Sequence, residues 1–170
     1  MNTSESKRMK LVAILMALLA LSYAGFLFLP YFRVYNAQTG QLGYSITGFS
    51  VAFGKNSSSE HIIGSNLMII AEIAGMAGGL ITLIFALWFI FSKNHSPFMY
   101  FLLGLSIPCI ASAIASIFLS GPIYQNLNSI HNRVLIYSPF FFITATLTII
   151  SFLLNGFILI YSSFRKIQSK

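Results

Sequence analysis

Acidic side chains are scarce in this sequence, and one of them lies inside an apolar segment. The chain has 170 residues and only three Asp or Glu residues, which are Glu5, Glu60 and Glu72. Glu72 falls in the run NLMIIAEIAGMAGGLITLIFALWFIF, residues 66–91, which holds no other charged residue. An ionisable group in such a run is costly unless a partner or a cavity receives it, so Glu72 is a candidate functional residue.

Glu72 shares a helical face with Gly75 and Gly79, so we expect it to point toward neighbouring helices. The predicted partners are Arg33, Arg133 or a polar group in the connection after the third apolar run. Two interpretations of this residue stay open. It either ties its helix to the base of the outer loop, or it serves ligand binding or proton coupling in an outward-facing cavity.

Asn155 is a second polar candidate, because it lies in the last apolar run with Thr144, Thr148 and Ser151 on one narrow helical stripe. An amide in hydrocarbon needs a hydrogen-bond partner, and such interhelical bonds contribute about 0.6–2 kcal/mol in measured systems. Asn155 is therefore predicted to be a structural clamp or, alternatively, a ligand contact.

Metal and catalytic chemistry have little support. Glu60, His61 and His131 could bind a metal if the two outer connections meet, and only their position on the same side supports such a site. The chain has no Asp, which excludes Ser-His-Asp arrangements. Cys109 is its only cysteine, which excludes an intrachain disulfide and a cysteine-based zinc site. We therefore expect no enzyme and no cofactor.

The composition indicates which elements must position these residues. Apolar residues make up 56% of the chain, charged residues 8%, and the mean hydropathy is +0.81. Four runs reach the roughly 20 apolar residues that a spanning helix needs: about 11–32, 66–91, 98–119 and 139–161. The sequence predicts an all-α integral membrane protein, a single four-span domain over residues 1–170 built as a transmembrane four-helix bundle. The first run exceeds the length of a signal-peptide core, so it is expected to stay uncleaved.

Small residues and one proline shape the predicted helices. Ala71, Gly75 and Gly79 repeat at four-residue spacing, which is typical of close helix packing in membranes. Pro108 lies in the middle of the third run, where it lacks a backbone donor and crowds the carbonyl of Gly104. A kink is expected there.

The net charge of +7 does not indicate nucleic-acid binding, because the basic residues flank the apolar runs and form no patch with interleaved aromatics. The pattern fits the positive-inside rule. Seven basic residues lie on one side, Lys7, Arg8, Lys10, Lys93, Arg165, Lys166 and Lys170, and three lie on the other, Arg33, Lys55 and Arg133. A multi-pass protein of the cell membrane, here the plasma membrane, is expected, with both termini in the cytoplasm and the lipid bilayer as surroundings.

The outer loop of residues 33–64 contains a predicted β-hairpin. Residues 31–36 and 42–48 are rich in aromatic and β-branched residues and flank NAQTGQ, which has turn chemistry. In outline this arrangement resembles claudin-like four-span proteins, which also have cytoplasmic termini and a β-rich first extracellular segment. The paired cysteines and the tryptophan motif of that family's first loop are absent, since Trp88 and Cys109 both lie in apolar runs.

Two functions follow as hypotheses. The first is a non-catalytic membrane protein that acts by interaction through its outer face, as an accessory subunit of a membrane complex or by self-association. The second is a small oligomeric transporter or channel subunit that uses Glu72 for coupling or selectivity. A membrane enzyme is least favoured, because no nucleophile with a matching base is visible.

Overall fold

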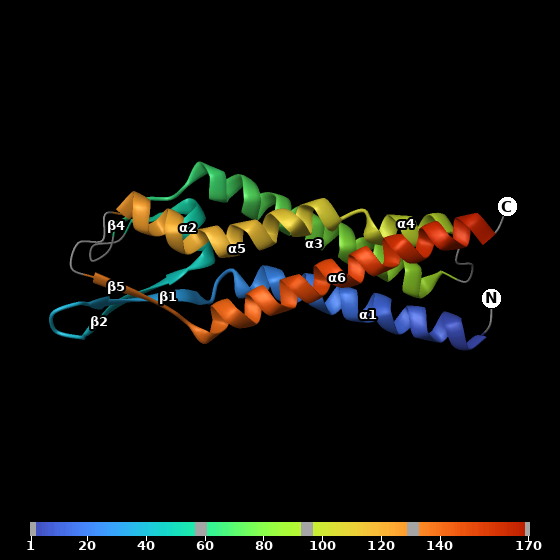
Figure 1. Cartoon of the computed structure of the whole chain (residues 1–170), viewed down its shortest axis with the longest axis horizontal. Helices are drawn as coiled ribbons and strands as arrows, with labels where there is room; N and C mark the ends of the chain where they lie inside the picture. The colour runs from blue at the N-terminus through green and yellow to red at the C-terminus, as the bar shows by residue number, and fades with distance from the viewer. Residues whose placement is uncertain (1–2, 57–60, 93–96, 129–132, 169–170) are drawn as a thin grey trace.

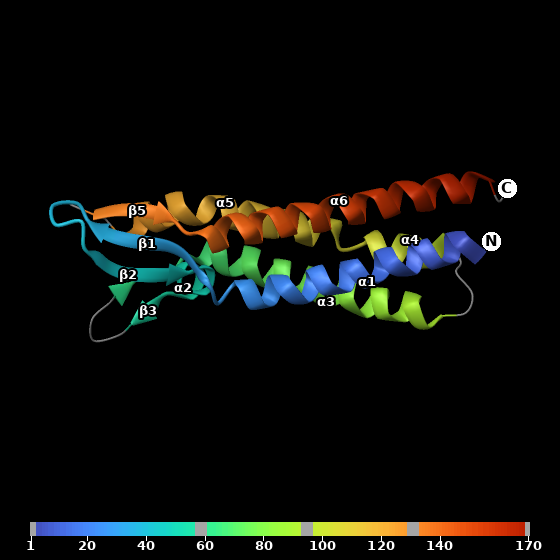
Figure 2. The same cartoon turned by 90° about the horizontal axis from the view of Figure 1, so that it is seen from below.

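The structure is a computed structural model that describes residues 3–56, 61–92, 97–128 and 133–168. It is mostly helical, at 73%, and carries a small sheet. Three helices are long and apolar enough to cross a membrane: Asn66–Phe91, Ile107–Asn128 and Pro139–Phe164. The long helices lie side by side, with the sheet at one end and both chain termini at the other (Figures 1 and 2).

The described helices are, in chain order, α1 (Thr3–Phe26), α2 (Gly48–Phe53), α3 (Asn66–Phe91), α4 (Pro97–Gly104), α5 (Ile107–Asn128) and α6 (Pro139–Gln168). Helix α3 packs against α1 and α5, and α6 packs against α1, α4 and α5. The predicted spans at 66–91 and 139–161 are confirmed as α3 and as part of α6.

The strands gather at the end of the molecule away from the termini. They are β1 (Pro30–Asn36), β2 (Leu42–Thr47), β3 (Lys55–Asn56), β4 (His61–Ile62) and β5 (Arg133–Tyr137). A three-stranded sheet has the order β2-β1-β5, and both of its pairings are antiparallel. The short strands β3 and β4 form a separate antiparallel pair.

The predicted hairpin is confirmed, because β1 pairs with β2 across residues 30–36 and 42–47. Its turn follows from local chemistry. The Asn36 side chain accepts hydrogen bonds from the backbone amides of Gln38 and Thr39, at 2.8 and 3.3 Å. Gly40 adopts φ 66°, a left-handed conformation that glycine reaches without steric cost. An Asx-type turn and a glycine therefore reverse the chain here.

The predicted first span, residues 11–32, extends too far at its C-terminal end. Helix α1 ends at Phe26, and the chain enters β1 at Pro30. Proline has no amide proton and disfavours helical geometry at the residue before it, so a helix cannot run through this point. Tyr31 and Phe32 therefore belong to the sheet, where both side chains are fully buried.

The predicted third span, residues 98–119, is wrong as a single helix. The structure breaks it into α4 and α5, with Leu105 and Ser106 between them. Pro108 lies in the first turn of α5, where its missing amide proton leaves the carbonyl of Gly104 without the usual helical partner. The expected kink is thus a full break. Helix α5 also runs on to Asn128, well beyond the predicted end.

The all-α class with only a hairpin is also incomplete, because the connection before α6 contributes the third strand. Strand β5 pairs with β1 from Phe32 opposite Tyr137 to Asn36 opposite Arg133. Ser138, which follows β5, donates its hydroxyl proton to the carbonyl of Pro30. The connection between α1 and α3 and the connection between α5 and α6 therefore contribute strands to the same sheet, beside the ends of α1 and α6.

Two buried apolar clusters hold these elements together. The outer cluster joins the sheet to α1, α3, α5 and α6 through large side chains such as Tyr31, Phe32 and Phe141. The inner cluster lies toward the termini and includes Met16 of α1, Phe89 of α3 and Ile158 of α6. Glu72 lies at the level of the outer cluster, because its hydrogen-bond partner Tyr23 belongs to that cluster.

Candidate functional site

Glu72 is buried where helices α1, α3 and α5 meet. Its residue exposure is 1%, so the carboxyl group faces the protein interior and not the lipid. The buried positions of α3 follow helical spacing from Met68 through Glu72 and Gly75 to Thr82. Because the glutamate occupies one position on that packed face, the sequence-based expectation about its orientation is confirmed.

Two hydroxyl groups contact the Glu72 carboxyl group. Tyr23 of α1 donates from Oη to Oε2 at 2.9 Å, and Ser116 of α5 lies with Oγ 3.1 Å from Oε1. The Ser116 hydroxyl also contacts the carbonyl of Ala113 at 2.9 Å, within its own helix. Through these contacts Glu72 joins three helices at one buried point, which we call the Glu72 cluster (Tyr23, Glu72 and Ser116).

Gly75 makes the approach of Tyr23 possible. A Cβ atom at position 75 would lie 2.6 Å from Tyr23 Oη and 2.8 Å from the Cβ of Ala113. Real atoms do not pack at such distances, so only glycine at this position lets both neighbouring helices come close. The small-residue pattern in α3 therefore positions the hydroxyl that contacts Glu72.

The expected partners Arg33 and Arg133 do not contact Glu72. Both arginine side chains are exposed in the outer sheet. Arg133 instead donates from Nη1 to the hydroxyl of Tyr44 at 3.1 Å, and its guanidinium lies 5.5 Å from the centre of that ring. The prediction of an arginine partner is wrong because β5 and β1 carry these side chains outward, beyond the ends of the helices.

Tyr31 brings a further hydroxyl to this region. Its side chain is fully buried, and among the described residues its hydroxyl has no hydrogen-bond partner. Burial raises the pKa of the Tyr31 phenol, so the group stays neutral. Tyr31 is thus a neutral donor held near Glu72 but not bonded to it.

Asn155 belongs to a second buried group, the Asn155 cluster (Thr82, Ser106 and Asn155). The Ser106 hydroxyl donates to Asn155 Oδ1 at 3.0 Å and lies 2.5 Å from the hydroxyl of Thr82. Asn155 Nδ2 donates to the carbonyl of Ser151 at 2.8 Å. All three side chains are fully buried, and they join α3, the α4–α5 break and α6. This geometry matches the clamp interpretation of Asn155.

A small cavity lies beside Tyr23 of the Glu72 cluster. Its volume is about 20 Å³, which is enough for one water molecule but not for a larger solute. Tyr23 lines it from α1, and Thr148 and Ser151 line it from α6. The polar stripe of α6 and Tyr23 of the Glu72 cluster therefore line the same water-sized cavity.

The partners of Glu72 and Asn155 were not identified from the sequence. Tyr23, Ser116, Thr82 and Ser106 are uncharged residue types that occur in any membrane helix, and their spacing carries no motif. One signal was available for Ser106, since it lies two residues before Pro108, where a broken helix exposes backbone and side-chain groups to neighbouring helices.

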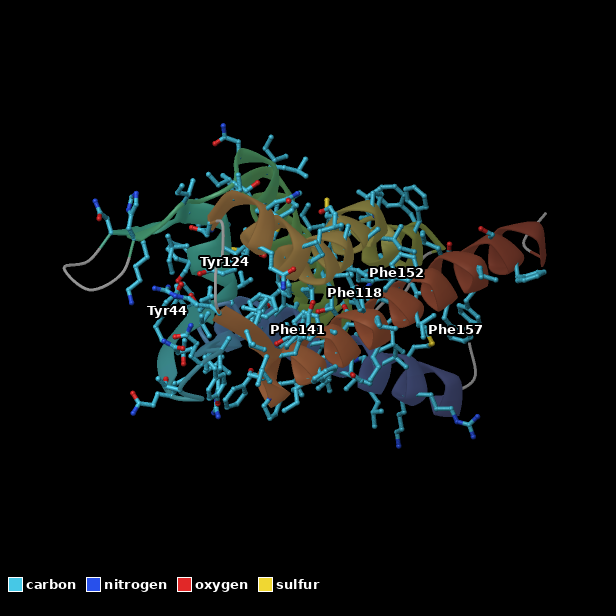
Figure 3. The ribbon with its side chains drawn as sticks, turned by 60° about the vertical axis from the view of Figure 1, so that its left-hand side comes forward. Tyr44, Phe118, Tyr124, Phe141, Phe152 and Phe157 are labelled. Atoms are coloured by element: carbon cyan, nitrogen blue, oxygen red, sulfur yellow. The ribbon has the colours of Figure 1, made fainter. Side chains whose placement is uncertain are left out.

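The sheet end of the molecule carries a separate set of contacts. Tyr44 of β2 bonds Tyr124 of α5 through their hydroxyls at 2.6 Å, and Figure 3 shows the two residues at the sheet end of the molecule. Together with the Arg133 contact, this links β5, β2 and α5. Phe118 of α5 and Phe141 of α6 meet edge to face nearer the middle of the molecule (Figure 3), with ring centres 6.2 Å apart.

The weak metal site falls largely outside the described residues. Glu60 and His131 lie in segments 57–60 and 129–132, which the structure does not describe. His61 is described, and its side chain is exposed in β4. The metal-site prediction therefore stays a prediction.

The chain matches no protein-family model, and comparison with curated proteins and with solved structures finds no similar chain. The resemblance to claudin-like proteins therefore stays a prediction from the sequence. Function must be inferred from the geometry of the two buried clusters and of the outer sheet.

Proposed function

We propose that this chain is a non-catalytic multi-pass membrane protein that acts by interaction through its outer sheet, as an accessory subunit of a membrane complex. The observation that supports this most is an exposed apolar face on the β2-β1-β5 sheet. Its strands come from both outer connections, and these are the two longest connections between the apolar runs.

The strand registers define this face. Val134, Tyr35 and Leu42 form one cross-strand row, and Ile136, Arg33 and Ser45 form the next. The intervening rows point inward, as the full burial of Phe32 and the near-complete burial of Val34 show. Leu42, Val134 and Ile136 are 52%, 47% and 49% exposed, so apolar side chains surround a single arginine on a surface outside the helices. Exposed apolar groups gathered in this way mark interaction sites.

Charge indicates the kind of partner. The outer connections contain Arg33, Lys55 and Arg133 but only one acidic residue, Glu60. A two-fold contact between identical sheets would bring the Arg33 side chains of both copies toward the same interface, where like charges repel. We therefore propose a different membrane protein, with an outer surface that is apolar and acidic, as the occupant of this face.

The proposal includes a specific placement in the membrane. Helix α1 has 24 residues, which gives a length of about 36 Å at 1.5 Å per residue and exceeds the roughly 30 Å hydrocarbon core. Leu11 and Leu18 of α1 are 68% and 59% exposed, as suits contact with lipid. We propose that α1 makes a fourth crossing, that the helices form a transmembrane four-helix bundle in the cell membrane, and that both termini are cytoplasmic.

Matched substitutions test the interaction. Ile136 lies on the sheet face, and Ile63 lies elsewhere on the outer end with nearly the same exposure, 49% against 48%. A photoreactive residue at position 136 should crosslink to one discrete membrane protein in native membranes, and Arg33→Glu should abolish that product. The same probe at position 63 should give no discrete product.

A crosslinked product with the mass of two copies of this chain would show self-association in place of the proposed partner. Absence of any discrete product from position 136, with the protein intact in the membrane, would overturn the proposed interaction.

A second candidate function is a small oligomeric transporter or channel subunit. The observation in its favour is the row of buried hydroxyl and amide groups from Glu72 through the cavity at Thr148 and Ser151 to Asn155. The cavity admits water but no larger solute, so the species moved would be a proton. Reconstituted wild-type protein should then pass protons across liposomes, and Glu72→Gln should not.

A further inference from the structure

The hydrogen bonds of the Glu72 cluster can be counted proton by proton. Tyr23 has one hydroxyl proton, which it donates to Glu72 Oε2. Ser116 also has one hydroxyl proton, but its Oγ lies within bonding distance of two oxygen atoms, Glu72 Oε1 and the carbonyl of Ala113. If Glu72 were a carboxylate, Ser116 would have to share its single proton between these two oxygen atoms.

We infer that Glu72 is a proton-binding site, occupied at neutral pH, in which Oε1 carries the proton and donates it to Ser116 Oγ. Ser116 then donates its own proton to Ala113, and Tyr23 donates to Oε2. Every proton in the cluster has one acceptor in this arrangement. The inference concerns the state of the buried carboxyl group and does not rest on the proposed function.

The surroundings agree with a neutral group. A carboxylate can accept about four hydrogen bonds, and buried charges are paired in proteins. No charged side chain in the described part of the chain contacts Glu72, and both candidate arginines are exposed. The titratable groups that face it are the phenols of Tyr23 on α1 and Tyr31 on β1.

Tyr31 provides an independent observation. Its buried hydroxyl lies near Glu72 and has no hydrogen-bond partner among the described residues. A carboxylate with unused lone pairs would attract such a donor, whereas a carboxylic acid that already accepts from Tyr23 has less need of it. The unpaired phenol is therefore explained if the neighbouring group is uncharged.

Infrared spectroscopy tests this inference directly, because the chain has only three acidic side chains. The full-length protein would be measured at neutral pH in a detergent that contains no carbonyl group. One carboxylic-acid carbonyl band should appear in the wild type, disappear in Glu72→Gln, and persist in the control Glu60→Gln.

Ser116→Ala gives a second readout that does not depend on replacing the glutamate. The acid would lose the oxygen to which it donates, so the band should remain and shift to higher frequency. A wild-type spectrum without an acid band at neutral pH, or a band that survives Glu72→Gln, would overturn the inference. A band that Ser116→Ala leaves at its original frequency would overturn the assignment of the proton to Oε1.

Discussion

Gly75 is the residue whose substitution best tests the packing around Glu72. A methyl group at position 75 would collide with Tyr23 Oη and with Ala113. Gly75→Ala should therefore destabilise the protein by about 1–3 kcal/mol, the usual cost of overpacking. Thermal unfolding in detergent measures this loss.

Gly79→Ala is the matched control for that prediction. A Cβ at position 79 has only the Ala20 carbonyl nearby, at 3.4 Å, so the variant should unfold close to the wild-type temperature. Tyr23→Phe removes the atom nearest to the added methyl group and should recover part of the loss in a Gly75→Ala background. Equal destabilisation by the two glycine variants would contradict this packing.

At the level of single residues, the sequence predicted which groups are buried better than which groups they contact. Glu72 was identifiable because one carboxyl group in an apolar run stands out against its neighbours. Arginine was expected as its partner, because a positively charged side chain is the usual partner of a buried carboxylate. The actual partners, Tyr23 and Ser116, are neutral, and only the three-dimensional approach of α1 and α5 to Gly75 selects them.

The break between α4 and α5 depends on a proline, and the same helix contains a second proline for comparison. Pro108 lies in the first turn of α5, whereas Pro122 lies inside it without ending it. Pro108→Ala restores an amide proton that can bond the carbonyl of Gly104. Hydrogen exchange of the amides between residues 104 and 110 should therefore slow in this variant.

Pro122→Ala restores an amide proton far from the break, so it should leave exchange at residues 104–110 unchanged. If exchange there does not respond to Pro108→Ala either, the proline is not the cause of the break. The hydrogen bonds of Ser106 to Thr82 and Asn155 would then hold the two helices apart.

The sheet is joined to the helices by a chain of polar contacts from Arg133 through Tyr44 to Tyr124. Tyr44→Phe removes both hydroxyl contacts, while Tyr124→Phe removes one of them. Each loss should cost about 0.5–1.5 kcal/mol of stability, the net value of a typical hydrogen bond. The loss in the double variant should be smaller than the sum of the two single losses, because both changes remove the same bond.

Chemical unfolding of the three variants measures this coupling. Ser163→Ala is a suitable control, since its hydroxyl is exposed and bonds only within α6. Fully additive losses would show that the two tyrosine hydroxyls act independently and that β2 is not held to α5 in this way.

Among the elements, those with a strong local pattern were predictable. Helix α3 was recognisable from its long apolar run. The β1–β2 hairpin was recognisable from the turn between Asn36 and Gly40. Strand β5 was missed because RVLIY is five residues long and its strand character depends on pairing with β1, which is distant in sequence. The end of α5 was missed because the predicted apolar run stops at residue 119, whereas the helix continues through residues 120–128, with Gly121 close to the Tyr137 side chain.

At the scale of the whole molecule, the arrangement of the two ends supports an even number of crossings. The ends of α1 and α6 that carry the termini lie together, and the sheet lies at the opposite end (Figure 2). The basic residues Lys7, Arg8 and Lys10 stand at the first of these ends. Because basic residues favour the cytoplasmic side, the terminal end should face the cytoplasm and the sheet should face outward.

Single cysteines at three positions distinguish four crossings from three. In a Cys109→Ala background, Ser4→Cys and Gln168→Cys should react with an impermeant maleimide only after the cells are permeabilised, whereas Asn56→Cys should react in intact cells. If α1 did not cross, position 4 would label together with position 56 while position 168 stayed protected. If the orientation were reversed, positions 4 and 168 would label in intact cells and position 56 would not. Protection of position 56 with labelling of positions 4 and 168 would therefore contradict the proposed orientation. Labelling of position 4 together with position 56 would contradict the crossing by α1.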